Sequence, residues 1–290
     1  MAVYSNSVKK RDWKQYISSR LGFWFGILLL VLLGIIVLAP LAWALSSSLR
    51  NPREAFKLPP DWLPLNPDWS NYGKVFEQIP YATYLWNSIF VCSVTIAGQL
   101  VTATMAGYAF ARLPFPGKGI IFWFILATLM IPIQATIIPV FVLMSKLHLV
   151  DTHASLILPA IVTAFGTFLL RQYFLRIPNE FEEAGVIDGA NQFQVFYKIY
   201  LPLALPGLAI LALLSFNFYW NDFYRPLIFI SSNEKFTLPL GIVTLFGFLG
   251  TNSISVVLAG VMLSLLPVFV IYLIGQRYLI EGIAMGGIKG

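Results

Sequence analysis

Long apolar stretches alternate with shorter polar segments along the whole chain. A helix needs about 20 mainly apolar residues to cross the hydrocarbon core of a bilayer. Six stretches have roughly this length: Leu21–Leu45, Tyr84–Ala111, Gly119–Met144, Ser155–Phe174, Leu203–Ile230 and Ile254–Gly275. The first is the clearest, because residues 23–44 contain no charge. The pattern predicts an all-α membrane protein with six transmembrane helices in a single membrane domain that covers residues 1–290.

Composition strengthens the membrane assignment. Of the 290 residues, 58% are hydrophobic and only 11% are charged, and the mean hydropathy is +0.77. Soluble domains are typically about one quarter charged. The net charge of +6 is not gathered into basic patches with interleaved aromatic residues. We therefore expect membrane lipid around the chain and no nucleic acid as a partner.

The distribution of positive residues predicts an orientation. If both termini lie inside, the inner segments hold 12 of the 19 Lys and Arg residues. Cytoplasmic loops of membrane proteins carry such an excess. We therefore expect an N-in, C-in topology. It comprises a cytoplasmic N-terminus (1–20), a proline-rich outer loop (46–83), a cytoplasmic loop (177–202) and a cytoplasmic tail (276–290).

Residues that could hold a metal ion or form a disulfide are few. Cys92 is the single cysteine, so an internal disulfide is excluded, and its apolar surroundings predict a small buried hydrophobic residue. His148 and His153 flank Asp151, but a metal site needs more ligands in a tighter arrangement. We expect no metal site and interpret both histidines as solvated loop residues.

The polar segment between the fourth and fifth stretches, residues 177–206, has unusual local chemistry. Pro178 discourages continuation of the preceding helix, and Asn179 with Glu182 forms a capping-box pattern. Gly189 provides a helix stop, and Asn191 opens a second short helix. The residues alone predict two short helices at the membrane face. They leave open whether this is an ordinary capped loop or a docking surface for another protein.

A motif in this segment resembles the EAA loop of binding-protein-dependent ABC importers. That motif reads EAA, three residues, G, nine residues, then I-x-L-P. Here Glu183-Ala184-Gly185 is followed at those spacings by Gly189 and by Ile199, Leu201 and Pro202. Gly185 replaces the second alanine, which exchanges one small residue for another.

The resemblance extends along nearly the whole chain, and it is to the sugar branch of these permeases, in particular to maltose-type, MalG-like subunits. The segments that carry it are Asn87-Ser88, Gly107 to Arg112, Ile131-Pro132, Trp220-Asn221-Asp222 and the Gly286 to Gly290 tail. It implies a type I ABC importer permease fold in the plasma membrane of a bacterium or archaeon. It also implies that the chain forms half of the translocation path for a sugar or oligosaccharide and that transport is coupled to ATP hydrolysis.

The resemblance also implies partners and a coupling site. The EAA loop would be a coupling helix that docks on an ATPase subunit; the residues carried over are Glu183, Ala184, Gly185, Asp188 and Gly189. The chain has no GxxxxGK[ST] phosphate loop, so it is no enzyme itself, and ATP and Mg would bind the ATPase. The expected partners are a second permease of different sequence, two ATPase subunits and an extracytoplasmic sugar-binding protein. The tail, with Gly287 and Lys289, would either reach the ATPase or be a plain flexible terminus.

Polar residues inside the apolar stretches are candidates for a substrate path. They are Gln99, Gln134, Asn217, Asn221 and, as an aromatic surface for sugar rings, Trp220. Polar groups at membrane depth usually face the bundle interior or a water-filled path, but they also form hydrogen bonds between helices. Both interpretations stay open for these residues. A secondary transporter or channel is the alternative function, although the chain shows no clear internal repeat.

Overall fold

The computed structural model describes residues 13–51, 66–247 and 253–287, and these residues form helices and connecting loops without any strand. Three helices dominate: α1 (Trp13–Ser48), α3 (Tyr81–Arg112) and α14 (Ile254–Gly287). The shorter helices of the first half are α2 (Ser70–Gln78), α4 (Lys118–Thr128), α5 (Ile133–Lys146), α6 (Ala154–Ile157), η2 (Leu158–Ala160) and α7 (Ala164–Arg176). Those of the second half are α8 (Glu180–Ile187), α9 (Gln192–Gln194), the π-helix η3 (Val195–Tyr200), α10 (Leu201–Leu203), α11 (Leu205–Trp220), α12 (Tyr224–Phe229), η4 (Asn233–Lys235) and α13 (Leu238–Thr244).

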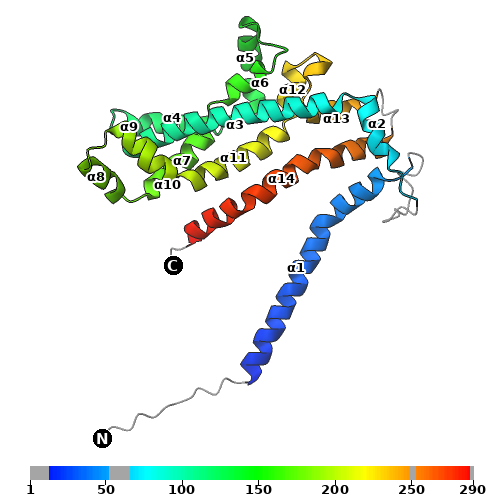
Figure 1. Cartoon of the computed structure of the whole chain (residues 1–290), viewed down its shortest axis with the longest axis horizontal. Coiled ribbons are helices and arrows are strands. Elements are labelled where there is room, and N and C mark those ends of the chain that lie inside the picture. Colours follow the sequence, from blue (N-terminus) through cyan, green and yellow to red (C-terminus); the bar gives the residue numbers. More distant parts are fainter. Residues whose placement is uncertain (1–12, 52–65, 248–252, 288–290) are drawn as a thin grey trace.

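The centre of the bundle is α3, which packs along α7 and α11, while α11 packs against α14 (Figure 1). Gly107 allows the close approach of α3 and α7, because a Cβ there would lie 2.9 Å from Leu170 Cβ and 3.0 Å from the Arg171 backbone nitrogen. Apolar side chains fill three clusters along this bundle. One of them, around Tyr108, Phe174 and Tyr200, packs the α8–η3 segment against the bundle.

The apolar stretches predicted from the sequence all fall on helices, but not all as single helices. Four helical segments are long and apolar enough to cross a membrane, and six are counted if each of two bent pairs forms one span. The stretch Gly119–Met144 is not one straight helix, because α4 and α5 meet at 99° around Pro132. Pro132 lacks a backbone N–H and cannot continue the helical hydrogen bonds. The number of six spans therefore stays a prediction.

One predicted boundary is wrong. The fifth stretch, Leu203–Ile230, is divided at Trp220, where α11 ends before the separate short helix α12. The last stretch, Ile254–Gly275, agrees with the apolar span Ile254–Arg277, and α14 continues beyond that span to Gly287, so the first part of the predicted tail is helical. Lys289 lies outside the described residues.

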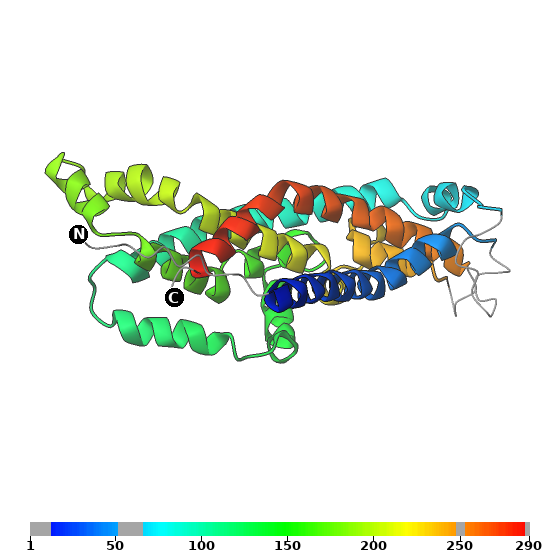
Figure 2. The ribbon, with the colours of Figure 1, turned by 90° about the horizontal axis from the view of Figure 1, so that it is seen from below.

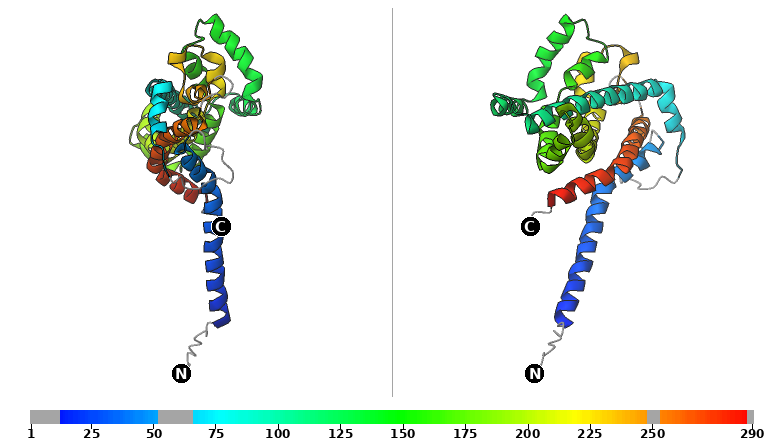
Figure 3. Two further views of the ribbon diagram at one scale, coloured as in Figure 1. Left: turned by 90° about the vertical axis from the view of Figure 1, so that its right-hand side faces the viewer. Right: turned by 60° about the vertical axis from the view of Figure 1, so that its left-hand side comes forward.

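Helix α1 diverges from the bundle. Only its C-terminal end approaches the other helices, where it packs against α14, and its remaining length projects away (Figures 1 and 3). None of the residues in its most apolar stretch is buried within the chain. Figure 2 shows α4 also running along the outside of the bundle. These helices expose apolar surface that only lipid or another apolar protein surface can cover.

Candidate functional site

The α8–η3 segment forms the pair of short helices that the sequence predicts. Gly189 ends the first helix with a φ of +82°, a left-handed conformation that glycine adopts at no steric cost. Asn191 begins the second with a complete capping box, in which its side chain accepts from Gln194 N and its backbone N–H donates to Gln194 Oε1, both at 2.9 Å. Both predictions are confirmed. The segment is thus a helical hairpin whose turn is fixed by its own sequence.

The predicted capping role of Asn179 is wrong. Asn179 has helical backbone angles and its side chain caps nothing in α8. Instead, its Oδ1 accepts a hydrogen bond from Arg112 Nη1, which comes from the end of α3. The Asn179 side chain therefore binds Arg112 instead of capping α8. This contact attaches the start of α8 to the bundle.

The five residues assigned to docking do not share one side of α8. Glu183, Ala184, Asp188 and Gly189 are exposed, whereas Gly185 is buried. A Cβ at position 185 would lie 2.4 Å from Ile199 Cδ1, so Gly185 faces the second helix of the hairpin.

Two large apolar residues that the sequence reasoning did not single out share the exposed surface of α8. Val186 is 59% exposed and Ile187 is 85% exposed. They lie beside Glu182 and Glu183 at an open cavity of about 760 Å³, which Arg112 also lines. The signal in the sequence was the pair of apolar residues directly before Asp188-Gly189 in an otherwise polar turn. The outward surface of α8 is therefore part apolar and part acidic, as expected of a surface that binds another protein.

Arg112 joins the hairpin to the bundle. Its Nη2 donates to the Phe174 carbonyl at 2.6 Å and also to the Ile177 carbonyl, so one guanidinium satisfies carbonyls at the end of α7. The same guanidinium lies over the ring of Tyr200, 4.9 Å from its centroid. The ends of α3 and α7, the start of α8 and the π-helix η3 thus meet at one side chain.

Among the predicted substrate-path residues, Gln99 forms hydrogen bonds to other parts of the bundle. Its amide nitrogen donates to the Ala160 carbonyl at 2.7 Å and contacts Tyr219 Oη at 2.6 Å, and its carbonyl accepts from Ser215 Oγ at 2.7 Å. The side chain is 2% exposed. For Gln99, hydrogen bonding between helices is the interpretation that fits, because no part of its amide is left for a substrate.

The other four candidates do not gather around one cavity. Asn217 and Asn221 are exposed at the end of α11, where Asn221 Nδ2 donates to Asn217 O at 2.8 Å. Trp220 is buried, and its indole N–H donates to Ser264 O at 3.2 Å. Gln134 is exposed on α5, which projects away from α11 (Figure 1). Only the two asparagines therefore offer neighbouring polar groups on an open surface.

An apolar cavity lies beside Trp220. It measures about 800 Å³ and lies between α3, α11 and α14, with Trp220, Phe216 and Cys92 in its wall. Cys92 is 3% exposed, which confirms the predicted buried hydrophobic role. A wall of this kind suits an acyl chain or an apolar helix, because it has few groups that could satisfy sugar hydroxyls.

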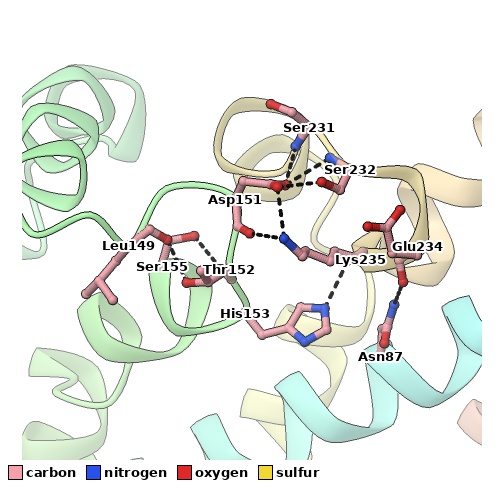
Figure 4. Close-up of polar contacts among 10 residues, drawn as sticks. All are labelled: Asn87, Leu149, Asp151, Thr152, His153, Ser155, Ser231, Ser232, Glu234 and Lys235. Atoms are coloured by element: carbon pink, nitrogen blue, oxygen red, sulfur yellow. Dashed lines mark hydrogen bonds and ion pairs between the residues drawn. The ribbon is translucent and has the colours of Figure 1, made fainter.

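A second polar cluster lies between the α5–α6 loop and the loop after α12 (Figure 4). The Asp151 carboxylate accepts from the backbone N–H groups of Ser231 and Ser232, both at 2.9 Å, and from Lys235 Nζ at 2.9 Å. The Ser232 hydroxyl, its backbone N–H and Lys235 hold the pKa of Asp151 well below its usual range. His153 Nε2 pairs with the Lys235 carbonyl at 3.0 Å, so this histidine is partnered rather than simply solvated. The cluster fixes one loop against the other.

Comparisons with known proteins give a consistent result. The family model for binding-protein-dependent transport system inner membrane components matches residues 75–283. The arabinooligosaccharides transport system permease protein AraQ of Halalkalibacterium halodurans is 39% identical over 76% of this chain and 79% of its own length. The AraQ protein of Bacillus subtilis is 33% identical over 91% of this chain and 94% of its own.

A solved structure agrees over nearly the full length. A chain of a bacterial ABC transporter involved in the import of the acidic polysaccharide alginate superposes with a TM-score of 0.79 at 27% identity. The superposition covers 96% of this chain and 99% of that chain.

Proposed function

Because the chain belongs to the family of binding-protein-dependent transport system inner membrane components, we propose that it forms half of the translocation path of an ATP-driven importer for a sugar or oligosaccharide. As a member of this family the chain is a membrane transport subunit and not an enzyme. The observation that carries the substrate class is its likeness to two arabinooligosaccharide permeases and to a subunit of an alginate importer.

We propose further that α8 is the helix that couples this chain to a separate ATPase. The exposed residues Glu183, Ala184, Asp188 and Gly189 would contact the ATPase, together with Val186 and Ile187. Gly185 would act from the inside, by letting α8 lie close to Ile199. ATP and Mg would bind the ATPase, since the sequence of this chain has no phosphate loop.

The contacts of Arg112 support a route for movement into the bundle. When the ATPase subunits close on ATP, α8 would be displaced with the surface it binds. Arg112 would then carry the displacement to α3 and α7, because it bonds to Asn179, Phe174 and Ile177. A packed unit of this kind moves as a body rather than deforming continuously.

Topology and partners complete the proposal. The bent pair of α4 and α5 would count as one span and α11 as another, which with the four long apolar helices gives six spans with both termini in the cytoplasm of a bacterium or archaeon. A second permease of different sequence, two ATPase subunits and an extracytoplasmic sugar-binding protein would form the rest of the importer. The end of α14 with Gly287 would lie on the ATPase side. Asn217 and Asn221 are the residues through which this chain would contact the sugar.

The proposal is tested by transport in proteoliposomes that contain the chain with its co-purified partners. Uptake of an arabino-oligosaccharide in the presence of the binding protein should require ATP on the cytoplasmic side and should not respond to an ion gradient. Uptake driven by an ion gradient without ATP would instead support a secondary transporter.

A further inference from the structure

Two basic side chains line a small pocket between α4 and α7. The pocket measures about 270 Å³, and its lining consists of Lys118, Gly119, Phe122, Trp123, Leu126 and Arg171. Lys118 comes from the first turn of α4, and Arg171 comes from the middle of α7. The two helices are in contact along this region. The pocket therefore combines two cations with an apolar wall.

Both cations are held at the C-terminal end of α3. Lys118 Nζ donates to the carbonyls of Leu113 at 3.0 Å and Ala111 at 3.3 Å, and Arg171 Nε donates to the carbonyl of Phe110 at 3.1 Å. A helix C-terminus carries only about half an elementary negative charge. It cannot neutralise two full positive charges.

Carboxylates do not supply the missing negative charge. The ion pairs found in residues 13–51, 66–247 and 253–287 involve Lys74, Arg225 and Lys235, and neither cation of the pocket takes part in one. Arg171 places its guanidinium carbon 4.2 Å from the centre of the Phe122 ring, which orients it but does not neutralise it. The pocket therefore has a positive charge that an anion would complement.

The wall of the pocket indicates what kind of anion fits. Phe122 and Leu126 form its apolar side, and Trp123 beside them is 73% exposed. Beyond Lys118, α4 carries no charge to its end at Thr128. Cations at the end of an apolar span, next to a tryptophan, are the arrangement found at a membrane–water boundary. An inorganic anion would leave the Trp123 side of the pocket exposed, whereas a lipid would cover it.

We propose that this pocket binds an anionic phospholipid, with the headgroup phosphate between Lys118 and Arg171 and an acyl chain along Trp123 and Leu126. Basic pockets between transmembrane helices recognise anionic headgroups in this way. The orientation proposed above places the lipid in the cytoplasmic leaflet, but the pocket itself does not depend on that orientation.

Native mass spectrometry of the purified chain, together with the partners that accompany it, tests the proposal. The detergent-solubilised protein is mixed with phosphatidylglycerol or with phosphatidylcholine, and the retained lipid is counted for each variant. The variants are the double substitution Lys118→Gln with Arg171→Gln, the charge-conserving pair Lys118→Arg with Arg171→Lys, and Arg176→Gln, which removes one positive charge outside the pocket. Neither ATP nor sugar is needed, so failure of the transport proposal would not affect the result.

The wild-type protein, the charge-conserving pair and Arg176→Gln should retain phosphatidylglycerol in preference to phosphatidylcholine. In the double Gln variant, affinity should fall about twenty-fivefold, because each basic side chain near an anionic surface contributes about fivefold. Undiminished retention by the double Gln variant would overturn the proposal. Loss of the lipid from the charge-conserving pair, equal retention of phosphatidylcholine by the wild type, or displacement of the lipid by inorganic phosphate would overturn it as well.

Discussion

Tyr200 donates a hydrogen bond from its hydroxyl to Glu182 Oε2 across 2.7 Å, and this contact joins the two helices of the α8–η3 hairpin. Tyr200 is fully buried, and its ring lies under the guanidinium of Arg112. Glu182 belongs to the first turn of α8. Glu182 therefore links the two helices of the hairpin through Tyr200. Arg112, on the ring of the same tyrosine, attaches the hairpin to the bundle.

Removing this hydroxyl should loosen the hairpin without removing its packing. Tyr200→Phe keeps the ring but breaks a hydrogen bond to a charged group, which contributes about 1.5–3 kcal/mol. We expect more ATP hydrolysed per sugar imported in the reconstituted importer. Tyr197→Phe is the matched control, because Tyr197 is 59% exposed on the same π-helix. An unchanged ratio for Tyr200→Phe would contradict a role of this contact in coupling.

Arginine at position 112 should not be replaceable by lysine. One ammonium cannot reach the Phe174 carbonyl, the Ile177 carbonyl and the Asn179 side chain in the geometry of a planar fork. A half-buried carbonyl left without a donor costs about 1–3 kcal/mol. We expect Arg112→Lys to reduce sugar uptake severalfold while the ATPase still co-purifies. Arg176→Lys, on the exposed end of α7, should leave uptake unchanged; equal effects of the two substitutions would refute the prediction.

Position 185 should accept alanine but not leucine. The nearest atom to an added Cβ is Ile199 Cδ1, the far end of a flexible side chain, so a small shift can relieve the 2.4 Å approach. The better helix propensity of alanine, about 0.8–1.0 kcal/mol, offsets that shift. Gly185→Ala should therefore change the free energy of unfolding by less than about 1 kcal/mol, whereas Gly185→Leu should cost about 1–3 kcal/mol by overpacking. Thermal unfolding in detergent measures both, and equal Tm values for the two variants would show that α8 and η3 are not closely packed.

The carboxylate of Asp151 should stabilise the loop contact at neutral pH. Its folded-state pKa lies below the ordinary value of about 3.9, so its contribution is complete above that value and is lost as the pH falls through the folded pKa. Asp151→Asn should unfold at a lower temperature than the wild type at pH 7. The difference should shrink as the pH is lowered below about 4. Glu77→Gln, on the exposed surface of α2, is the control; a difference that grows on acidification would contradict the assignment.

The features that could be predicted from the sequence are mostly those that depend on residues close together in the chain. The left-handed turn at Gly189 and the capping box at Asn191 depend on neighbours within a few residues, and both are present. The burial of Cys92 follows from the apolar stretch around it. These features needed no knowledge of the distant chain.

The errors arise where distant residues compete with local ones. Asn179 stands where a helix cap is expected from the sequence. Its side chain instead accepts a hydrogen bond from Arg112, which is far away in the chain. Gln99 is a polar residue in an apolar stretch, as a substrate-binding residue would be. Its side-chain amide, however, is hydrogen-bonded to Ser215 and to the Ala160 carbonyl. Hydrophobicity marks Gly119–Met144 as a span but does not show the 99° bend within it. Tertiary contacts, rather than propensity, decide such positions.

The proposed function depends most on the binding of a separate ATPase by α8. Its most direct test is co-purification from native membranes through a C-terminal tag, comparing the wild type with Gly189→Asp. The control Gly117→Asp places the same side chain at another glycine with positive φ, +75° against +82°. We expect an ATPase and a second permease to accompany the wild type and Gly117→Asp, whereas Gly189→Asp should retain the permease but lose the ATPase. A wild-type chain that emerges alone from several mild detergents, or an ATPase retained equally by all three proteins, would contradict it.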